Sequence, residues 1–260
     1  NIYVYEAPYT KEHYDPDYNS NYFGDGQELL KDAFAAIKDQ IPSDVNLDAD
    51  SNGDIDAVDF FVPAQTDWAT FLWPHMSSIY DGTGKTEVNG AKLSKYNLIT
   101  TDYFSGSGYQ VITHEFMHTL GYPDMYVYGY NTTSLPDPIG NWTMMSGNTG
   151  YPTVWERERY GGWVAEEQIP TISKNGSYEL SDASKNPETN TIAYKIAIPN
   201  SNEFFMVEYR NQNANEYEAL VPSTGIIVYR VNPNRYGNGN GNPEVYVLRN
   251  SGYGSYSAAL

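Results

Sequence analysis

Apolar residues recur at helical spacing in two stretches of this 260-residue chain. The segment 27–40 (QELLKDAFAAIKDQ) places Leu30, Phe34 and Ile37 on one face, which predicts an amphipathic helix. The segment 109–120 (YQVITHEFMHTL) predicts a second helix, and the glycine that follows it, with a proline two residues further on, ends that helix.

Short apolar or alternating runs predict strands elsewhere. In the first half these are IDAVDFFVPAQ, from Ile55, and KLSKYNLITTDYF, residues 92–104. After Trp163 the runs GSYELSD, TIAYKIAIP, EFFMVEYRN and TGIIVYRVNP are separated by Asn, Gly, Pro and Ser. We therefore predict an α+β protein, with a twisted mixed sheet in residues 1–165 and a β-rich C-terminal part, 166–260, packed on it. The last twenty or so residues, rich in Gly, Asn, Ser and Tyr, are expected to be loosely ordered.

Composition narrows the class of partner. The apolar fraction of 40% and the charged fraction of 18% are those of a folded protein. A net charge of −18 argues against nucleic acid and against anionic membranes, whereas it supplies carboxylates for cations such as calcium. No run of apolar residues is long enough to span a membrane. Because the chain has no cysteine, any metal must be held by His, Asp, Glu or carbonyl oxygen.

The segment HEFMHTLGYPD, residues 114–124, carries the pattern of a catalytic metal site. His114 and His118 lie one helical turn apart, so both ring nitrogens can reach one zinc ion at about 2.0–2.1 Å. Glu115 is rotated roughly 100° around the helix and borders the metal without binding it. A left-handed residue after the helix lets the chain double back and bring Asp124 up as a third ligand, which leaves a fourth position for water.

The alternative for the same residues is a pair of core histidines beside a surface glutamate. Neighbouring tyrosines are candidates for stabilising an oxyanion: Tyr122, Tyr126 and Tyr151. The pattern does not choose among them. Arg157 and Arg159 alternate with glutamates and are expected on a solvated helix face.

The acidic segment DADSNGDIDAVD, residues 48–59, matches a twelve-residue calcium loop. A glycine falls at position 6 and an isoleucine at position 8. The candidate ligands, at positions 1, 3, 5, 7 and 12, are Asp48, Asp50, Asn52, Asp54 and Asp59. A predicted strand, not a long helix, follows the loop, so we expect a structural calcium ion. The alternative is a solvated acidic turn.

Several motifs together resemble the immune inhibitor A family of secreted bacterial zinc metallopeptidases. They are WPHMSSIYDG, LSKYNLIT, HEFMHTLGYPDMY, GNWTMMSG, PTVWERERYGGWV and GIIVYRVN, and they occur in the order seen in that family, over about residues 20–235. The resemblance implies a zincin or metzincin-like catalytic domain in residues 1–165. By that resemblance His114, His118 and Asp124 bind zinc and Glu115 is the general base.

The resemblance also assigns Met145, in GNWTMMSG, as the methionine of a turn beneath the metal. The family pattern has Asp after the tryptophan of this turn, and here that position is Thr143, which changes how the turn is braced. The family usually has sheet strands before its first helix. This chain starts after them, which is consistent with a processed or partial form.

The predicted function is hydrolysis of peptide bonds in extracellular proteins by a secreted, monomeric zinc endopeptidase. Zinc-bound water would be the nucleophile, and Glu115 would take its proton. A substrate would lie extended along a sheet edge, for which the strand around Leu98 is the candidate. We expect that a leader has been removed, and an inhibitory pro-segment fits the same interpretation. The alternatives are a non-catalytic carbohydrate- or protein-binding module with structural metals, and a metal-dependent hydrolase of another bond.

Overall fold

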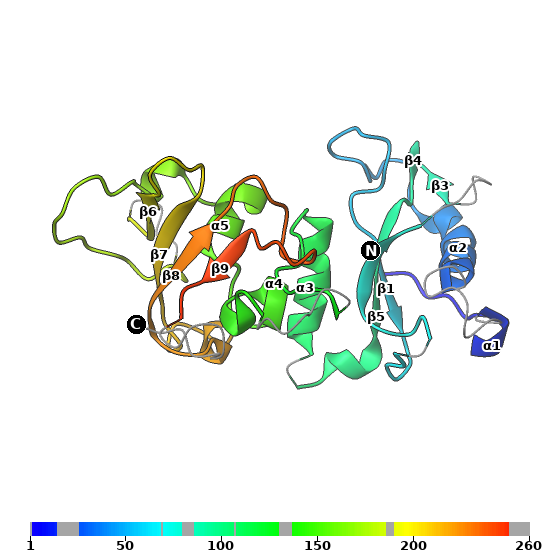
Figure 1. Cartoon of the computed structure of the whole chain (residues 1–260). Coiled ribbons are helices and arrows are strands. Elements are labelled where there is room, and N and C mark those ends of the chain that lie inside the picture. Colours follow the sequence, from blue (N-terminus) through cyan, green and yellow to red (C-terminus); the bar gives the residue numbers. More distant parts are fainter. Residues whose placement is uncertain are drawn as a thin grey trace. The chain divides into compact units, whose positions relative to one another are not determined.

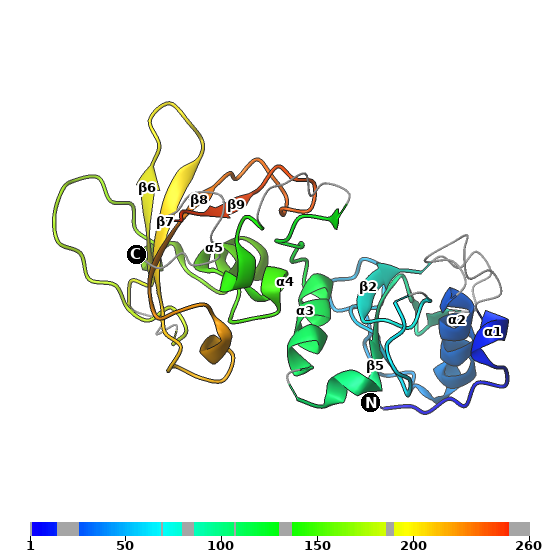
Figure 2. The same cartoon turned by 60° about the horizontal axis from the view of Figure 1, so that its bottom comes forward.

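The computed structural model describes residues 2–14, 26–68, 70–79, 86–106, 108–129, 137–185 and 190–249. The chain forms two compact units, Asn1–Thr119 and Leu120–Leu260, each drawn as a ribbon in Figures 1 and 2. Each unit contains helices and a sheet, so the α+β prediction is confirmed at that level. In the described ranges, no helix has the length and apolar character needed to cross a membrane.

The first unit is built around a three-stranded mixed sheet. Its strands are β1 (Asp59–Val62), β2 (His75–Ser78) and β5 (Lys95–Thr100), in the order β1-β5-β2. The central strand β5 runs parallel to β1 and antiparallel to β2, so Leu98 pairs with both Phe60 and His75. Because neighbours cover β5 on both edges and both faces, residues 96–100 are buried without interruption.

Two helices, α2 (Gly26–Ile37) and α3 (Tyr109–Thr119), cover opposite faces of this sheet (Figures 1 and 2). The helical elements of the unit are α1 (Lys11–Tyr14), α2 (Gly26–Ile37), η1 (Lys38–Gln40), η2 (Thr101–Phe104) and α3 (Tyr109–Thr119). The helix predicted for residues 27–40 is confirmed, although its last turn tightens into the 3₁₀ helix η1. Leu30 and Phe34 are buried and Ile37 packs against the same core, so the predicted apolar face of α2 is its buried face.

A small hairpin holds the acidic loop in place. It consists of β3 (Glu87–Val88) and β4 (Ala91–Lys92). The backbone N–H of Lys92 donates to the Gly53 carbonyl at 3.0 Å, and its carbonyl accepts from the Ile55 N–H at 2.9 Å. The acidic loop is therefore held by hydrogen bonds to the hairpin at Gly53 and Ile55.

The second unit contains a four-stranded antiparallel sheet. Its strands, in spatial order, are β6 (Ala193–Ala197), β7 (Phe204–Arg210), β8 (Gly225–Val231) and β9 (Val245–Val247). The shorter elements are η4 (Gly140–Trp142), α4 (Met144–Gly147), α5 (Val154–Glu156), a π-helical turn η5 (Arg157–Gly161), η6 (Glu166–Gln168) and η7 (Glu218–Leu220). The first three strands confirm the predicted runs from 191 to 233.

Three expectations for this unit were wrong. The run GSYELSD, 176–182, forms no strand and only an isolated bridge at Asp182, since its other residues lack a sheet partner. Strand β9 lies in the tail expected to be loose, because it pairs with β8; residues 250–260 lie outside the described part of the chain. Arg157 is 7% exposed, not solvated, because its guanidinium turns inward and donates to the Ala183 carbonyl.

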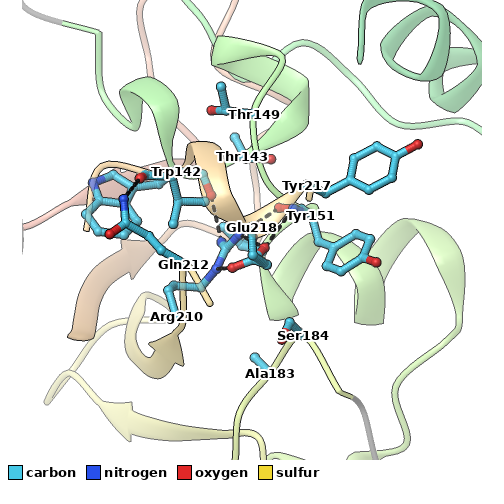
Figure 3. Close-up of polar contacts among 12 residues, drawn as sticks. Trp142, Thr143, Thr149, Tyr151, Ala183, Ser184, Arg210, Gln212, Tyr217 and Glu218 are labelled. Carbon is cyan, nitrogen blue, oxygen red and sulfur yellow. Dashed lines mark hydrogen bonds and ion pairs between the residues drawn. The ribbon is translucent and has the colours of Figure 1, made fainter. Parts of the chain in front are cut away.

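Charged side chains occupy the buried face of this sheet. Along β7 every second residue is buried, and these residues are Met206, Glu208 and Arg210. All five N–H groups of the Arg210 guanidinium find acceptors, and Figure 3 shows those at Trp142, Tyr151 and Glu218. Two go to the Glu218 carboxylate, one to the Glu208 carboxylate, one to the Trp142 carbonyl and one to the Tyr151 carbonyl. The pair with Glu218 has the two-pronged geometry that arginine favours with carboxylates.

The compact units divide at a different place from the predicted boundary at residue 165. Residues 142–157 belong with the C-terminal sheet because they form hydrogen bonds with the buried acids and the buried arginine of that part of the chain. The Val154 N–H donates to Glu208 at 2.8 Å, and the Trp155 indole donates to Glu244 at 2.6 Å. These contacts join segments more than fifty residues apart, which no local pattern records.

We predict that Arg210→Met destabilises the protein by about 3–5 kcal/mol, because it leaves Glu208 and Glu218 buried without their cation. Urea denaturation of the full chain measures this change. The control is Arg230→Met, on the neighbouring strand. Arg230 pairs with Glu203 at 3.6 Å with 37% of its side chain exposed, so about 1 kcal/mol or less is expected. Equal effects of the two substitutions would contradict the prediction.

Candidate metal centre

Helix α3 presents both histidines of the predicted site on one face. The helix is confirmed for Tyr109–Thr119, and it packs against β5 and β2. His114 is buried and His118 is half-buried. Their ring centroids lie 4.8 Å apart with the ring planes at 88°. The one-turn spacing therefore brings two imidazoles together, as the sequence predicted.

Glu115 is buried on α3 and is oriented by the backbone of strand β2. One of its carboxylate oxygens accepts the Met76 N–H at 2.8 Å. Met76 lies opposite Asn97, whose own N–H bonds to Val58 on the other side, so the Met76 N–H points to the outer edge of the sheet, where Glu115 accepts it. The carboxylate is fixed in direction by a main-chain donor, as a proton-transferring group requires.

Asp124 lies in an irregular segment just beyond the helix. Gly121 has φ of +91°, the left-handed conformation predicted for the end of α3, and the chain turns there. Along the continuous stretch 114–124, one ligand atom from each of His114, His118 and Asp124 lies within 4.8 Å of the other two. Ligand atoms around a tetrahedral zinc ion lie about 3.4 Å apart, since each bond is about 2.0–2.1 Å long. Two imidazoles and a carboxylate within this limit could hold a metal ion.

A buried carboxylate stabilises the turn that contains Met145. The Met145 carbonyl accepts the Met125 N–H at 2.7 Å, next to Asp124. Thr143 caps α4, because its hydroxyl oxygen accepts the Met145 N–H at 3.3 Å. The same hydroxyl donates to Glu156 at 2.9 Å. Thr143 thus links the Met145 turn to an acid supplied from α5.

Glu156 is fully buried and receives three hydrogen bonds. Besides Thr143, the backbone N–H and hydroxyl of Thr153 donate to it at 2.8 and 2.7 Å. Burial is the larger effect and raises the pKa of Glu156 to about 7. The negative charge of Glu244 acts in the same direction. The carboxyl group that stabilises the Met145 turn therefore titrates near neutral pH.

The three tyrosines named as oxyanion candidates all have aromatic neighbours within the second unit. Tyr122 is almost fully buried against the rings of Tyr160 and Trp163, and burial raises its pKa. Tyr126 meets Tyr128 edge to face, and Tyr151 stacks on Tyr217. That one of the three stabilises an oxyanion stays a prediction.

The acidic loop brings together a partly different set of carboxylates from the predicted one. Ligand atoms of Asp48, Asp50 and Asp56 lie within 4.8 Å of one another. Asp59 instead begins β1, where its carboxylate accepts the Asn97 amide N–H at 2.7 Å. The Gly53 N–H donates to Asp48 and is the chief cause that lowers the pKa of that carboxyl. Asp56, at position 9 of the loop, was not among the predicted ligands.

Sequence reasoning also missed residues that contact the Asp124 segment. The Tyr128 hydroxyl donates to the Asp124 carboxylate at 3.0 Å. The backbone N–H of Asn238 donates to the Asp124 carbonyl at 2.9 Å. The spacing of Tyr128, four residues after Asp124, was a signal within reach, but Asn238 lies more than a hundred residues away in a Gly/Asn-rich stretch.

A scan against protein-family models and searches of curated proteins and of solved structures found no match to this chain. The resemblance to the immune inhibitor A family therefore stays a prediction that rests on the motifs themselves.

We predict that the stability difference between the wild type and Glu156→Gln depends on pH. The folded protein binds the Glu156 proton more tightly than the unfolded chain, whose pKa is near 4.5. The wild type is therefore favoured most below pH 4.5 and loses about 3 kcal/mol relative to the variant as the pH rises to about 7. Urea denaturation of both proteins at a series of pH values measures the difference. A difference that does not change with pH would refute the buried-acid interpretation.

Proposed function

We propose that this protein is a secreted bacterial zinc-dependent endopeptidase with a zincin-like catalytic domain. The observation that carries the proposal is the grouping of His114, His118 and Asp124, with Glu115 buried beside the two histidines and held by a backbone N–H. A purely structural zinc site is closed by four protein ligands and has no use for an adjacent carboxylate. The motif resemblance agrees with the same assignment.

When bound, zinc supplies a Lewis acid that polarises the scissile carbonyl and lowers the pKa of a water molecule. The two imidazoles and Asp124 would hold the ion. Glu115 takes up the proton of the attacking water and delivers it to the leaving nitrogen. Its bond to the Met76 N–H keeps one oxygen in place, so the carboxylate does not have to be oriented during the reaction.

The edge strand for an extended substrate is β2, not the strand around Leu98. That earlier assignment was wrong because Leu98 lies in β5, which is paired on both sides. Strand β2 is an edge strand of the three-stranded sheet in the described part of the chain, and Glu115 bonds to its outer N–H at Met76. A peptide added along β2 would lie beside the catalytic carboxylate and gain main-chain hydrogen bonds.

We predict that Glu115→Gln lowers the rate of casein hydrolysis about 100- to 10,000-fold while zinc stays bound. Glutamine keeps an oxygen that accepts the Met76 N–H, so the fold is retained, but it cannot take up a proton. Rates of casein cleavage and zinc content by elemental analysis are the measurements. The control is Glu167→Gln, at an exposed position. If the wild type and Glu115→Gln behave alike, the chain is not a peptidase of this kind, and a non-catalytic binding module becomes the better account.

We also propose a structural calcium ion in the acidic loop. Support comes from the match to a calcium loop and from the convergence of Asp48, Asp50 and Asp56. Three carboxylates this close repel one another unless a cation lies between them. The loop is anchored at Gly53 to the hairpin, so an ion bound there would stabilise the fold of the first unit.

We predict that calcium, added at about 100 times its dissociation constant, stabilises the wild type by about 2.7 kcal/mol. Asp48→Ala and Asp56→Ala are each expected to abolish this gain, because each removes a carboxylate of the group. Thermal unfolding with calcium or with a chelator measures it. Asp44→Ala, at an exposed position before the loop, is the control and should respond to calcium as the wild type does. A calcium response that survives in Asp48→Ala would exclude this site.

A further inference from the structure

The third metal ligand lies on a part of the chain that has no regular structure of its own. Residues 122–125 belong to no helix or strand, whereas the two histidines lie on a helix whose backbone bonds fix their direction. A ligand on irregular backbone keeps its position only if other segments bond to that backbone. The contacts of this segment are therefore informative.

A loop from the C-terminal sheet, residues 236–244 (YGNGNGNPE), supplies these bonds. The Asn238 N–H donates to the Asp124 carbonyl at 2.9 Å, and the Asn238 side-chain amide donates to the Met125 carbonyl at 2.7 Å. The Tyr236 hydroxyl donates to the Gly121 carbonyl at 3.2 Å. We call this segment the clamp loop. It holds the backbone on both sides of the Asp124 carboxylate.

The clamp loop is itself tied down by a buried acid, Glu244. The carboxylate of Glu244 accepts the Gly237 N–H, the Tyr160 hydroxyl and the Trp155 indole N–H, each at 2.6 Å. Arg159 pairs with the same carboxylate at 3.1 Å. The loop is thus fixed to α5 and the turn after it, elements that pack against the sheet.

At Gly237 the clamp loop leaves no room for a larger residue. A Cβ atom at Gly237 would lie 2.6 Å from the Asp124 carbonyl oxygen, and φ at this glycine is +64°. The next residue, Asn238, is fully buried, and its side-chain oxygen accepts the Val245 N–H. Because Gly237 has no side chain and a positive φ, the backbone of the clamp loop can lie directly against the backbone of Asp124.

We propose that the clamp loop, through Asn238, and Tyr128 together set the position of Asp124 for metal binding. This inference rests on the proposed zinc site. The Asn238 N–H acts on the Asp124 carbonyl, and its side-chain amide acts on the next carbonyl, that of Met125. The Tyr128 hydroxyl acts on the Asp124 carboxylate at 3.0 Å. Both are positioning residues, since neither belongs to the group that would contact the ion. Outer partners of metal ligands typically change metal affinity 10- to 100-fold when they are removed.

The test measures zinc affinity of the full chain by competition with a chromophoric chelator, and the visible absorption spectrum after cobalt substitution. Asn238→Ala removes the side-chain bonds, and Tyr128→Phe removes a single hydroxyl and keeps the ring. Each variant is expected to bind zinc about tenfold or more weakly than the wild type and to give an altered cobalt spectrum. The matched control is Asn240→Ala, an exposed asparagine two residues along the same loop. It should match the wild type in both measurements.

A purely structural role would lower the melting temperature of the metal-free protein and leave the affinity and spectrum of the folded variants unchanged. That result overturns the clamp proposal while the proposed function stands. If Asn238→Ala does not fold, Tyr128→Phe decides, because it leaves the packing intact. If the wild type itself binds no zinc, the proposed metal centre fails, and the clamp proposal fails with it.

Discussion

A buried guanidinium imposes the strictest constraint on the second unit. Arg210 is 2% exposed, and a charge at such depth is tolerable only if each of its N–H groups has an acceptor. The strand that carries it can supply one acceptor, Glu208. The others come from η7, from the carbonyl of Trp142 and from the loop at Tyr151. Those segments must therefore lie over this face of the sheet for the charge to be satisfied.

The same constraint reaches the proposed metal centre through a short series of contacts. Trp142, whose carbonyl Arg210 holds, is followed by Thr143, which bonds to Glu156 and caps the turn of Met145. The Met145 carbonyl then accepts the N–H of Met125. Each member of the series is buried, so each bond forms in a medium where losing it is costly. A network of this kind holds a ligand segment in one conformation before any ion binds.

The sequence predicted those features that depend on neighbours along the chain. Helices α2 and α3, the left-handed turn at Gly121 and strands β6 to β8 follow from periodicity and from local breakers. It failed where partners lie far apart. The alternation around Leu98 indicates a buried strand but cannot tell a central strand from an edge strand. The alternating charges at Arg157 resemble a solvated face, and only distant carbonyls and carboxylates make burial possible there. The loop positions alone do not predict Asp56, because only the fold of the loop brings its carboxylate next to those of Asp48 and Asp50.

Composition misled most in the Gly/Asn-rich tail, and the reason is physical. Glycine and asparagine are typical of flexible chain because one lacks a side chain and the other bonds to backbone groups. A segment that must lie against another backbone and donate hydrogen bonds to the carbonyls of that backbone needs the same two properties. Asn238 does this with one side chain, which bonds to carbonyls at residues 125 and 245 and to an N–H. A candidate ligand on a helix, such as His114, needs no such help, since its backbone bonds are made within the helix. The candidate ligands therefore differ: the two histidines are positioned by their own helix, and Asp124 is positioned by contacts within the second unit. In a site built this way, sequence-based prediction is therefore expected to be least accurate for the contacts around the aspartate.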